Sequence, residues 1–458
     1  MTLHLKKITA TLKKLKLDGW SLILQERESV ALHLTKGQEV ETVIAAARTQ
    51  ADITIYKRFG KHARGSEGRQ ERERPQLGDA RFTVFDDDEA TIRAKAKDAL
   101  LICASAKKPG YPLPKKQKYT SVQLADPAIV AAFKGGTAER LLLQTWSAIA
   151  AAQRKERGIG LDAAELDLSV LRLNVANSAG LRAKSESTAL FVECFFSVAA
   201  GAGKARREQE IHAAATVSRL ADLGPARFVR ENAQRARDAL AAERFNRVQD
   251  GRIVLSGDAL RDFWSPHLDV SPAVFHASAV AKYRKLSRYA LGKRITRNEC
   301  FTLLSNPALP FNPASSRFDL DGVASQAVPI IQEGVFRRHV ASQRYAHYLG
   351  VEATGALGSV EILPGAEETE ALFGDGTVEI VAFSSFVPNT VSGDFSAEVR
   401  LAYVRKDGTK TPIRAAMFSG NLFKMLDAMR LSKERTVTER YAGPSHIRFD
   451  EGATLAGF

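Results

Sequence analysis

Hydrophobic and polar residues alternate along much of the chain, and this period of two is typical of β-strands. In the N-terminal part, residues 20–24 and 29–34 alternate, which predicts two strands paired across Glu26, Arg27 and Glu28. The same pattern predicts further strands at residues 52–56, 166–174, 187–199, 252–255, 378–383 and 397–403.

Apolar residues that recur every three or four positions predict the helices. The apolar face of an N-terminal helix consists of Leu5, Ile8, Leu12 and Leu15. Asp87 and Asp88 can cap a second helix, because a carboxylate is favoured at the positive end of the helix dipole. The inward stripe of that helix consists of Ile92, Ala96, Ala99 and Cys103. Other helices are predicted at residues 128–133, 138–157 and 230–247.

One stretch in the C-terminal half, residues 316–354, combines a turn, a hairpin and a short helix. The turn is at residues 319–322, and Glu333-Gly334 is a tight connection between two strands, the second at residues 335–340. A helix-like run at 342–349 ends at Gly350. Its ionisable residues are scattered, so the stretch indicates scaffold rather than chemistry.

These elements predict an α+β protein, with an N-terminal α/β domain built on an antiparallel sheet, a middle segment of helices and strands, and a β-rich C-terminal domain. A chain of 458 residues is long for one domain. The Pro-rich run at residues 109–114 is the clearest linker. We therefore expect an N-terminal domain at 1–114, a central segment at 115–226 and a C-terminal domain at 227–458.

The net charge of +14 invites a nucleic-acid interpretation, but 52 acidic residues are interleaved with the 66 basic ones. The densest basic run, at residues 61–74, also carries three glutamates and no aromatic ring for base stacking other than His62. A solvated loop and a phosphate-binding patch both remain open for this run. The overall pattern argues against nucleic acid as the main partner.

Cysteine usage and hydropathy indicate the compartment. Cys103, Cys194 and Cys300 are far apart and odd in number, which favours a reducing environment over a disulfide framework. No apolar run approaches the roughly 20 residues that a membrane span needs. Lysines interrupt the apolar residues at the N-terminus, so we expect no signal-peptide core and a cytoplasmic protein without membrane contact.

Several short motifs occur in a fixed order along the chain. An Asn177-Ser178-x-Gly180 turn lies between two predicted strands, and Gly420-Asn421-Leu422 precedes a short helix. Between them, a polar loop carries the motif residues Asn389, Ser392, Gly393, Asp394, Phe395 and Ser396. With the stretch at 316–354, this order resembles the TldD/PmbA (TldE) family, peptidase-related proteins also described as modulators of DNA gyrase.

The resemblance implies where a zinc site would be. Catalytic members carry a His-Glu-x-x-x-His helix and a cysteine near the C-terminus; two imidazoles and a thiolate hold zinc, and the glutamate takes a proton from water. If His267 stands at the second histidine position, Asp262 occupies the first and Phe263 occupies that of the glutamate. The last cysteine is Cys300. The resemblance therefore implies the TldE/PmbA-like branch without the zinc motif, in which Asp262 and His267 are degenerate metal-site positions and this chain has no catalytic residue or cofactor.

The same resemblance implies a partner and a substrate. The partner would be a TldD-like zinc-bearing subunit in a heterodimer or higher hetero-oligomer, and the substrate an unfolded peptide enclosed for proteolysis. Because polar loop residues beside aromatic rings suit such a grip, the candidate peptide or partner contacts are Phe386, Asn389, Thr390, Asp394 and Phe395. A purely structural loop, a regulatory or nucleic-acid-associated protein of the gyrase-modulator type, and a homo-oligomer with a remodelled metal site remain alternatives.

Overall fold

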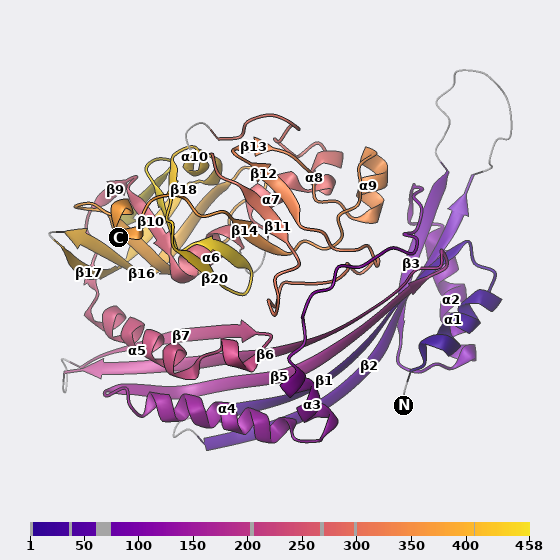
Figure 1. The fold of residues 1–458 in the computed structure, drawn as a ribbon, viewed down its shortest axis with the longest axis horizontal. Coiled ribbons are helices and arrows are strands. Elements are labelled where there is room, and N and C mark those ends of the chain that lie inside the picture. Colours follow the sequence, from indigo (N-terminus) through magenta and orange to yellow (C-terminus); the bar gives the residue numbers. More distant parts are fainter. Residues whose placement is uncertain are drawn as a thin grey trace.

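The computed structural model describes residues 3–35, 39–60, 75–201, 206–265, 270–296, 300–406 and 408–458. A long curved sheet supports a β-rich body that holds the C-terminus (Figure 1). The predicted basic run at 61–74 and His267 lie outside the described residues.

The N-terminal sheet consists of seven antiparallel strands in the order β4-β3-β2-β1-β5-β6-β7. These strands are β1 (Gly19–Thr35), β2 (Glu39–Phe59), β3 (Gln76–Val84), β4 (Lys107–Pro109), β5 (Ile159–Asn177), β6 (Arg182–Ala200) and β7 (Arg207–Val217). The sheet joins strands from residues 1–114 with strands from 115–226, so the predicted boundary at 114 does not separate two sheets.

The predicted hairpin across residues 26–28 is wrong, because β1 runs through these positions without a break. It pairs with β2 on one side and with β5 on the other over this whole stretch. The charged residues are accommodated by cross-strand ion pairs, since Arg172 of β5 contacts both Glu28 and Glu186. A charged triplet therefore marks here the solvated middle of a long strand and not a turn.

Helices cover the sheet in two groups, each with its own hydrophobic core. One end carries α1 (Leu5–Lys14) and α2 (Glu89–Cys103), and the other carries α3 (Pro127–Lys134), α4 (Ala138–Gln153) and α5 (Pro225–Ala241). The Asp88 carboxylate caps α2 by accepting a hydrogen bond from the Thr91 N–H at 2.7 Å, as predicted. The predicted stripe of α2 is also confirmed, since its four residues are buried. Helix α5 begins earlier than the predicted 230–247, because Pro225 follows the left-handed Gly224 and starts the helix.

The C-terminal domain contains a ten-stranded and a six-stranded sheet around one large core. The ten-stranded sheet consists of β8 (Glu243–Arg244), β9 (Val248–Asp250), β10 (Ile253–Ser256), β15 (Val378–Phe383), β16 (Asp394–Lys406), β17 (Thr409–Arg414), β18 (Ala416–Asn421), β19 (Met429–Leu431), β22 (His446–Phe449) and β23 (Ala453–Gly457). The six-stranded sheet consists of β11 (Leu303–Asn306), β12 (Val328–Gln332), β13 (Val335–Phe336), β14 (Ser359–Ile362), β20 (Arg435–Val437) and β21 (Tyr441–Pro444).

Short helices complete this domain: α6 (Gly257–Trp264), α7 (Pro272–Ala277), α8 (Ala279–Tyr283), α9 (Gln343–Leu349) and α10 (Leu422–Leu426). The tight turn predicted between β12 and β13 is confirmed, with Glu333 and Gly334 both at positive φ. The second strand of that hairpin is only β13, shorter than predicted. Helix α9 ends at the left-handed Gly350, also as predicted.

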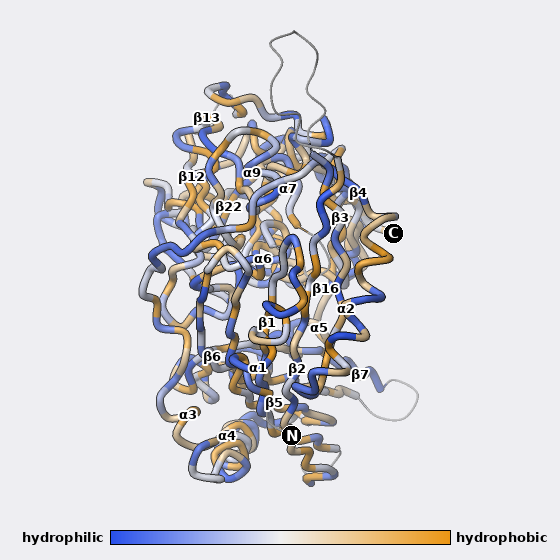
Figure 2. Tube along the Cα trace, turned by 90° about the vertical axis from the view of Figure 1, so that its right-hand side faces the viewer, coloured by the Kyte–Doolittle hydropathy of each residue, from blue (hydrophilic) through white to orange (hydrophobic). Residues whose placement is uncertain are grey.

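The mixture of helices and antiparallel-rich sheets confirms the α+β class. Apolar and polar residues alternate along many strands and helices (Figure 2), as expected for elements that bury one face. Among the described residues, we find no helix with the length and apolar character needed to cross a membrane.

Candidate functional site

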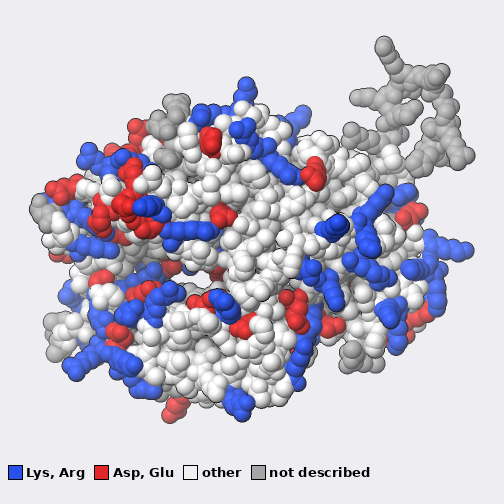
Figure 3. Space-filling model, in the orientation of Figure 1, with Lys and Arg blue, Asp and Glu red and all other residues white. Residues whose placement is uncertain are grey.

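A cleft of about 900 Å³ lies between the N-terminal sheet and the C-terminal domain. One wall is formed by the end of β7 and the following turn, and the other by residues 309–313, α6 and β20 with the residues after it. The surface is hollowed between these two bodies (Figure 3). A volume of this size falls within the range of roughly 300–1,000 Å³ of ligand-binding pockets.

Two strand edges meet at this cleft. Strand β7 is the last strand of the N-terminal sheet, and β20 is the last strand of the six-stranded sheet, so in the described chain each has a neighbour on one side only. Both contribute to the walls of the cleft. An edge strand presents unpaired N–H and C=O groups that can bind another extended chain.

The ladder between β20 and β21 shows which groups of β20 face outward. The Thr438 N–H donates to the Tyr441 carbonyl at 2.8 Å, and the Ser445 N–H donates to the Glu434 carbonyl at 2.7 Å. Hydrogen-bonded pairs alternate with non-bonded pairs in an antiparallel ladder, so the pairs of Arg435 and Val437 are non-bonded. The backbone N–H and C=O of these two residues therefore point away from β21, toward the open edge.

The charged side chains of the cleft are largely paired. Arg219 contacts Asp222 at 2.6 Å, and its guanidinium also lies 4.7 Å from the ring centre of Phe311. Arg435 contacts Glu361 at 2.5 Å. Val437, by contrast, is an apolar side chain with 57% of its surface exposed. The cleft thus offers backbone edges and apolar surface more than a concentrated charge.

Two of the predicted contact residues are core residues. Phe386 and Phe395 are buried, and their ring centres lie 5.2 Å from each other and 5.8 and 6.5 Å from that of Phe263. They do not line the cleft, and their contact with a peptide or partner stays a prediction. The alternation of the loop sequence identifies apolar positions but not which of them face the core.

Of the other three predicted contacts, Asn389 and Thr390 belong to the loop between β15 and β16, and Asp394 is the first residue of β16. The Asn389 carboxamide oxygen accepts hydrogen bonds from the N–H groups of Val391 and Ser392 at 3.0 and 2.9 Å. The Asn421 amide donates to the Asp394 carboxylate at 2.8 Å, and this bond lowers the pKa of Asp394. Asn389, Thr390 and Asp394 do not line the cleft, so their contact with a peptide stays a prediction.

The predicted metal-site positions lie on α6 and beyond its end. Asp262 accepts a hydrogen bond from the neighbouring Arg261 at 3.0 Å. Phe263 is fully buried, with its ring centre 5.2 Å from that of Phe449. Within the described ranges, no three His, Cys, Asp or Glu side chains are grouped as a metal ion requires. Because His267 lies outside those ranges, this position stays a prediction.

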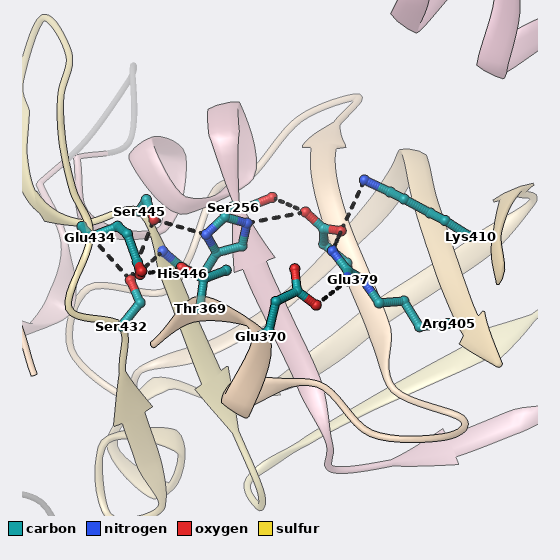
Figure 4. Close-up of polar contacts among 10 residues, drawn as sticks. All are labelled: Ser256, Thr369, Glu370, Glu379, Arg405, Lys410, Ser432, Glu434, Ser445 and His446. Carbon is teal, nitrogen blue, oxygen red and sulfur yellow. Dashed lines mark hydrogen bonds and ion pairs between the residues drawn. The ribbon is translucent and has the colours of Figure 1, made fainter. Parts of the chain in front are cut away.

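A polar cluster surrounds Glu379, a buried residue of β15 (Figure 4). Its carboxylate accepts a hydrogen bond from Ser256 at 2.7 Å and contacts Lys410 at 3.1 Å, His446 at 3.4 Å and Arg405 at 3.6 Å. Burial raises the pKa of Glu379, but the hydrogen bond from His446, the Lys410 ammonium and Ser256 outweigh it and lower the pKa to about 2.

The cluster continues from His446 to Ser445, whose hydroxyl lies 2.9 Å from His446 Nδ1. The side chains of Ser445, His446 and Glu379 thus contact one another in a row, as in a Ser-His-acid catalytic triad. Here, however, the Glu379 carboxylate is also paired with Lys410 and Arg405, and none of these residues lines the cleft. The arrangement ties β15 to β10, β17 and β22. The sequence alone does not predict this cluster, since its only sign there is one glutamate inside the apolar run at 378–383.

Comparison with known proteins defines the class. Residues 250–457 match the family described as PmbA/TldA metallopeptidase C-terminal domain. Residues 250–457 are therefore similar to the C-terminal domain of this family, in agreement with the resemblance predicted from the motif order.

The particular relatives are distant in sequence. An uncharacterised protein of Methanocaldococcus jannaschii is 30% identical over 186 residues, which cover 38% of this chain and 44% of that protein. The match thus spans less than half the length of this curated relative.

Solved structures resemble the whole chain. The crystal structure of TldE from Thermococcus kodakarensis has a TM-score of 0.76 and 18% identity, and the match covers 99% of both chains. The structure of a candidate modulator of DNA gyrase from Thermotoga maritima has a TM-score of 0.76 and 17% identity, and the match covers 98% of this chain and 99% of that one. Another candidate modulator of DNA gyrase, from Bacteroides thetaiotaomicron, has a TM-score of 0.77 and 15% identity, and the match covers 99% of this chain and 98% of that one. At this identity the likeness establishes the fold, which the chain shares along nearly its full length.

Proposed function

We propose that this chain is a TldE/PmbA-like subunit that binds and helps enclose an unfolded peptide, while a zinc-bearing TldD-like subunit cleaves it. The family of the C-terminal domain and the fold shared with TldE support this proposal. In it, the chain supplies no catalytic residue and no zinc ligand. Asp262 and His267 stand where a catalytic relative would hold the metal.

The observation that carries the peptide-binding part is the pair of free strand edges, β7 and β20, on opposite walls of one cleft. An extended peptide can pair with the outward N–H and C=O groups of Arg435 and Val437. Backbone hydrogen bonds give affinity with little dependence on the peptide's side chains. This suits a subunit that receives unfolded segments of varied sequence.

The binding test uses Val437→Pro and Val437→Ala, with a fluorescent unstructured peptide followed by anisotropy. Proline removes the outward N–H without breaking a bond to β21, whereas alanine removes most of the side chain and keeps the N–H. We expect Val437→Pro to weaken binding by about three- to tenfold, as for one lost hydrogen bond. Val437→Ala should weaken peptide binding less than Val437→Pro does.

A second arm uses the same peptide with methylated backbone nitrogens. Methylation removes the peptide's donors and leaves its side chains unchanged, so binding should fall sharply. Equal affinity for the two peptides, or equal affinity of the proline and alanine variants, would contradict pairing at this edge. Both arms are run on the chain alone and on its complex with a TldD-like subunit.

The subunit role is tested separately by co-purification with a TldD-like relative and by zinc analysis. We expect peptide hydrolysis and about one zinc per heterodimer in the complex, and neither in the isolated chain. Hydrolysis by the isolated chain that persists in Asp262→Ala would show that the class or the site is wrong.

The two bacterial structures are described as modulators of DNA gyrase, so a second candidate function is action on DNA gyrase or on DNA. The net charge of +14 is the feature of this chain that favours it. Steep salt dependence of DNA binding would support this function. If the protein is not retained on DNA at low salt, this second function is excluded.

A further inference from the structure

Another cavity, of about 410 Å³, lies at the end of the N-terminal sheet that carries α1. Its walls are formed by the last turn of α1 and the residues after it, the start of β1, and the turn between β5 and β6. In Figure 1, α1 lies at the opposite end of the long sheet from α4. The described linings of this cavity and of the cleft have no residue in common, so the two are separate.

The described lining of this cavity combines basic and apolar side chains and contains no acidic residue. The basic side chains are the exposed Lys13, Lys16 and Arg182, and the large apolar ones are Leu12, Leu17 and Trp20. Ligand pockets are typically apolar with a few polar groups that fix the orientation of the ligand. Positive charge beside apolar surface therefore suits a ligand that has both an anionic group and an apolar body.

The positive charge of the cavity is not balanced by nearby carboxylates of the described chain. Lys14, which does not line the cavity, contacts Glu89 at 2.9 Å. Within the described ranges, we find no ion pair of Lys13, Lys16 or Arg182. Basic residues at the end of α1 also stabilise the helix dipole, but Arg182 belongs to β6 and has no such role. Two segments far apart in the chain thus bring uncompensated cations to one cavity.

The backbone at Lys16 is strained. Helix α1 is capped by Leu15, and Lys16 follows it at φ 48°, in the left-handed region. Glycine is the usual residue at this position, because it has no Cβ to clash with the backbone. The β5–β6 turn on the facing wall does use glycine in this region, at Gly180 with φ 90°. A lysine in place of a glycine here is explained by a need for its ammonium group at the cavity.

The β5–β6 turn forms a rigid wall of the cavity. The buried Asn177 carboxamide oxygen accepts hydrogen bonds from the N–H groups of Ala179 and Leu181 at 2.9 and 3.1 Å. The Ser178 hydroxyl oxygen accepts a hydrogen bond from the Trp20 N–H at 3.1 Å and so ties the turn to β1. The Asn-Ser-x-Gly motif therefore holds this wall in place before any ligand binds, which lowers the entropic cost of binding.

We propose that this cavity binds a small phosphate monoester that carries an apolar group. A phosphate monoester has a charge of about −1.5 to −2 at pH 7 and three strong acceptor oxygens, which suit three cationic side chains better than one carboxylate does. Lys13, Lys16 and Arg182 contact the phosphate, and the apolar group lies against Trp20 and the two leucines. A volume of about 410 Å³ suits a free small molecule. This site goes beyond the proposed peptide function and does not depend on it.

The binding test titrates the purified full-length chain with phenyl phosphate in a calorimeter at low salt. Inorganic phosphate lacks the apolar group, and benzyl alcohol lacks the charge. We expect phenyl phosphate to bind, inorganic phosphate to bind several-fold more weakly and benzyl alcohol not to bind measurably. The affinity should fall as salt is added, because the contacts are ionic. No binding of phenyl phosphate, or equally tight binding of inorganic phosphate, would overturn the proposal.

A pair of charge variants separates this cavity from the general positive charge of the chain. Arg182→Gln and Lys14→Gln each remove one charge, but only Arg182 lines the cavity. Arg182→Gln should raise the dissociation constant of phenyl phosphate about tenfold, as for the loss of a hydrogen bond between charged groups. Lys14→Gln should leave it unchanged. Equal dissociation constants for the two variants would overturn the proposal.

Lys16→Gly gives a result that a purely structural role of the lysine would not produce. Glycine adopts φ 48° without strain, so the melting temperature should stay the same or rise, while the affinity for phenyl phosphate falls about tenfold. An unchanged affinity in this variant would contradict the site. Circular dichroism confirms that all variants are folded. Because no variant changes the cleft, peptide binding should be unaffected, and failure here is distinguishable from failure of the proposed function.

Discussion

Two regions of the C-terminal half each shield a carboxylate from solvent, Glu379 fully and Asp319 in part, and the net shifts of the two pKa values are opposite. Around Glu379, one hydroxyl and three basic side chains hold the charge, and the pKa falls to about 2. In the turn at Asp319, burial and the nearby Asp321 carboxylate raise the pKa to about 6, although backbone N–H groups bond to it. Burial alone therefore does not determine whether a carboxylate stabilises this fold.

The difference follows from what each region connects. Glu379 joins strands inside one domain, where side chains from β10, β17 and β22 converge on it. The Asp319 turn joins the two halves of the molecule: the Gly322 carbonyl accepts a hydrogen bond from the Tyr119 hydroxyl at 2.9 Å. Shape and backbone bonds fix that junction, and no basic side chain contacts Asp319 in the described structure. The junction therefore loses stability when its carboxylate ionises.

The largest expected effect is that of Glu379→Gln, which leaves Lys410 and Arg405 without their shared carboxylate. The free energy of unfolding should fall by about 3–4 kcal/mol at pH 7. The matched control is Glu186→Gln on the N-terminal sheet, a half-exposed partner of Arg172, which should cost under about 1 kcal/mol. Urea unfolding followed by circular dichroism measures both. Equal losses would show that the Glu379 cluster has no special role.

The pH dependence of Glu379 follows from its lowered pKa. Because the folded pKa of about 2 lies below the ordinary value of 4.5, its stabilisation is present above pH 4.5 and is lost as the pH falls toward 2. The wild type should lose up to about 3 kcal/mol over this window, beyond the loss seen in Glu379→Gln. Urea midpoints at pH 5, 4 and 3 measure it. Parallel curves for the two proteins would contradict the assignment.

Asp319 should give the opposite sign. Its folded pKa of about 6 exceeds the ordinary 3.8, so stability is lost as the pH rises from 3.8 through 6. Asp319→Asn keeps the oxygen that accepts the Asp321 and Val323 N–H groups and removes the charge. It should stabilise the fold by up to about 2–3 kcal/mol at pH 7 and by little at pH 3. A loss of stability at pH 7 would refute this account.

The smallest expected effect comes from alanine substitutions, which test how closely side chains pack around Gly322 at the junction. Gly322 has φ +86°, and a Cβ there would lie 2.6 Å from Leu181 Cδ2, whereas Gly136 has φ +66° and open space around it. Gly136→Ala should cost about 1 kcal/mol for the backbone conformation alone, and Gly322→Ala about 2 kcal/mol or more. Thermal unfolding of both variants measures the difference. Similar losses of stability in Gly136→Ala and Gly322→Ala would mean that the structure around Gly322 can shift to accommodate a Cβ atom.

Local patterns predicted much of the fold. The cap and stripe of α2, the β12–β13 turn and the end of α9 each depend on a few neighbouring residues, and all are confirmed. The order of the loop motifs predicted the family, because each motif is a turn whose backbone conformation favours particular residues.

The candidate site could not be predicted in this way. The cleft brings together β7 and β20, which are more than 200 residues apart, and no local pattern encodes their meeting. The same limit applies at Phe386 and Phe395, where the sequence marks apolar positions but not the partner rings that bury them.

The sequence by itself determined where single turns, caps and amphipathic faces form, since these depend on backbone preferences and on periodicity within a few residues. Tertiary structure alone decided that β1 runs unbroken through its charged middle, that Glu379 is held by distant cations and that two free strand edges share one cleft. Each of these depends on contacts between residues far apart in the chain, whose burial and pairing exist only once the sheets have assembled.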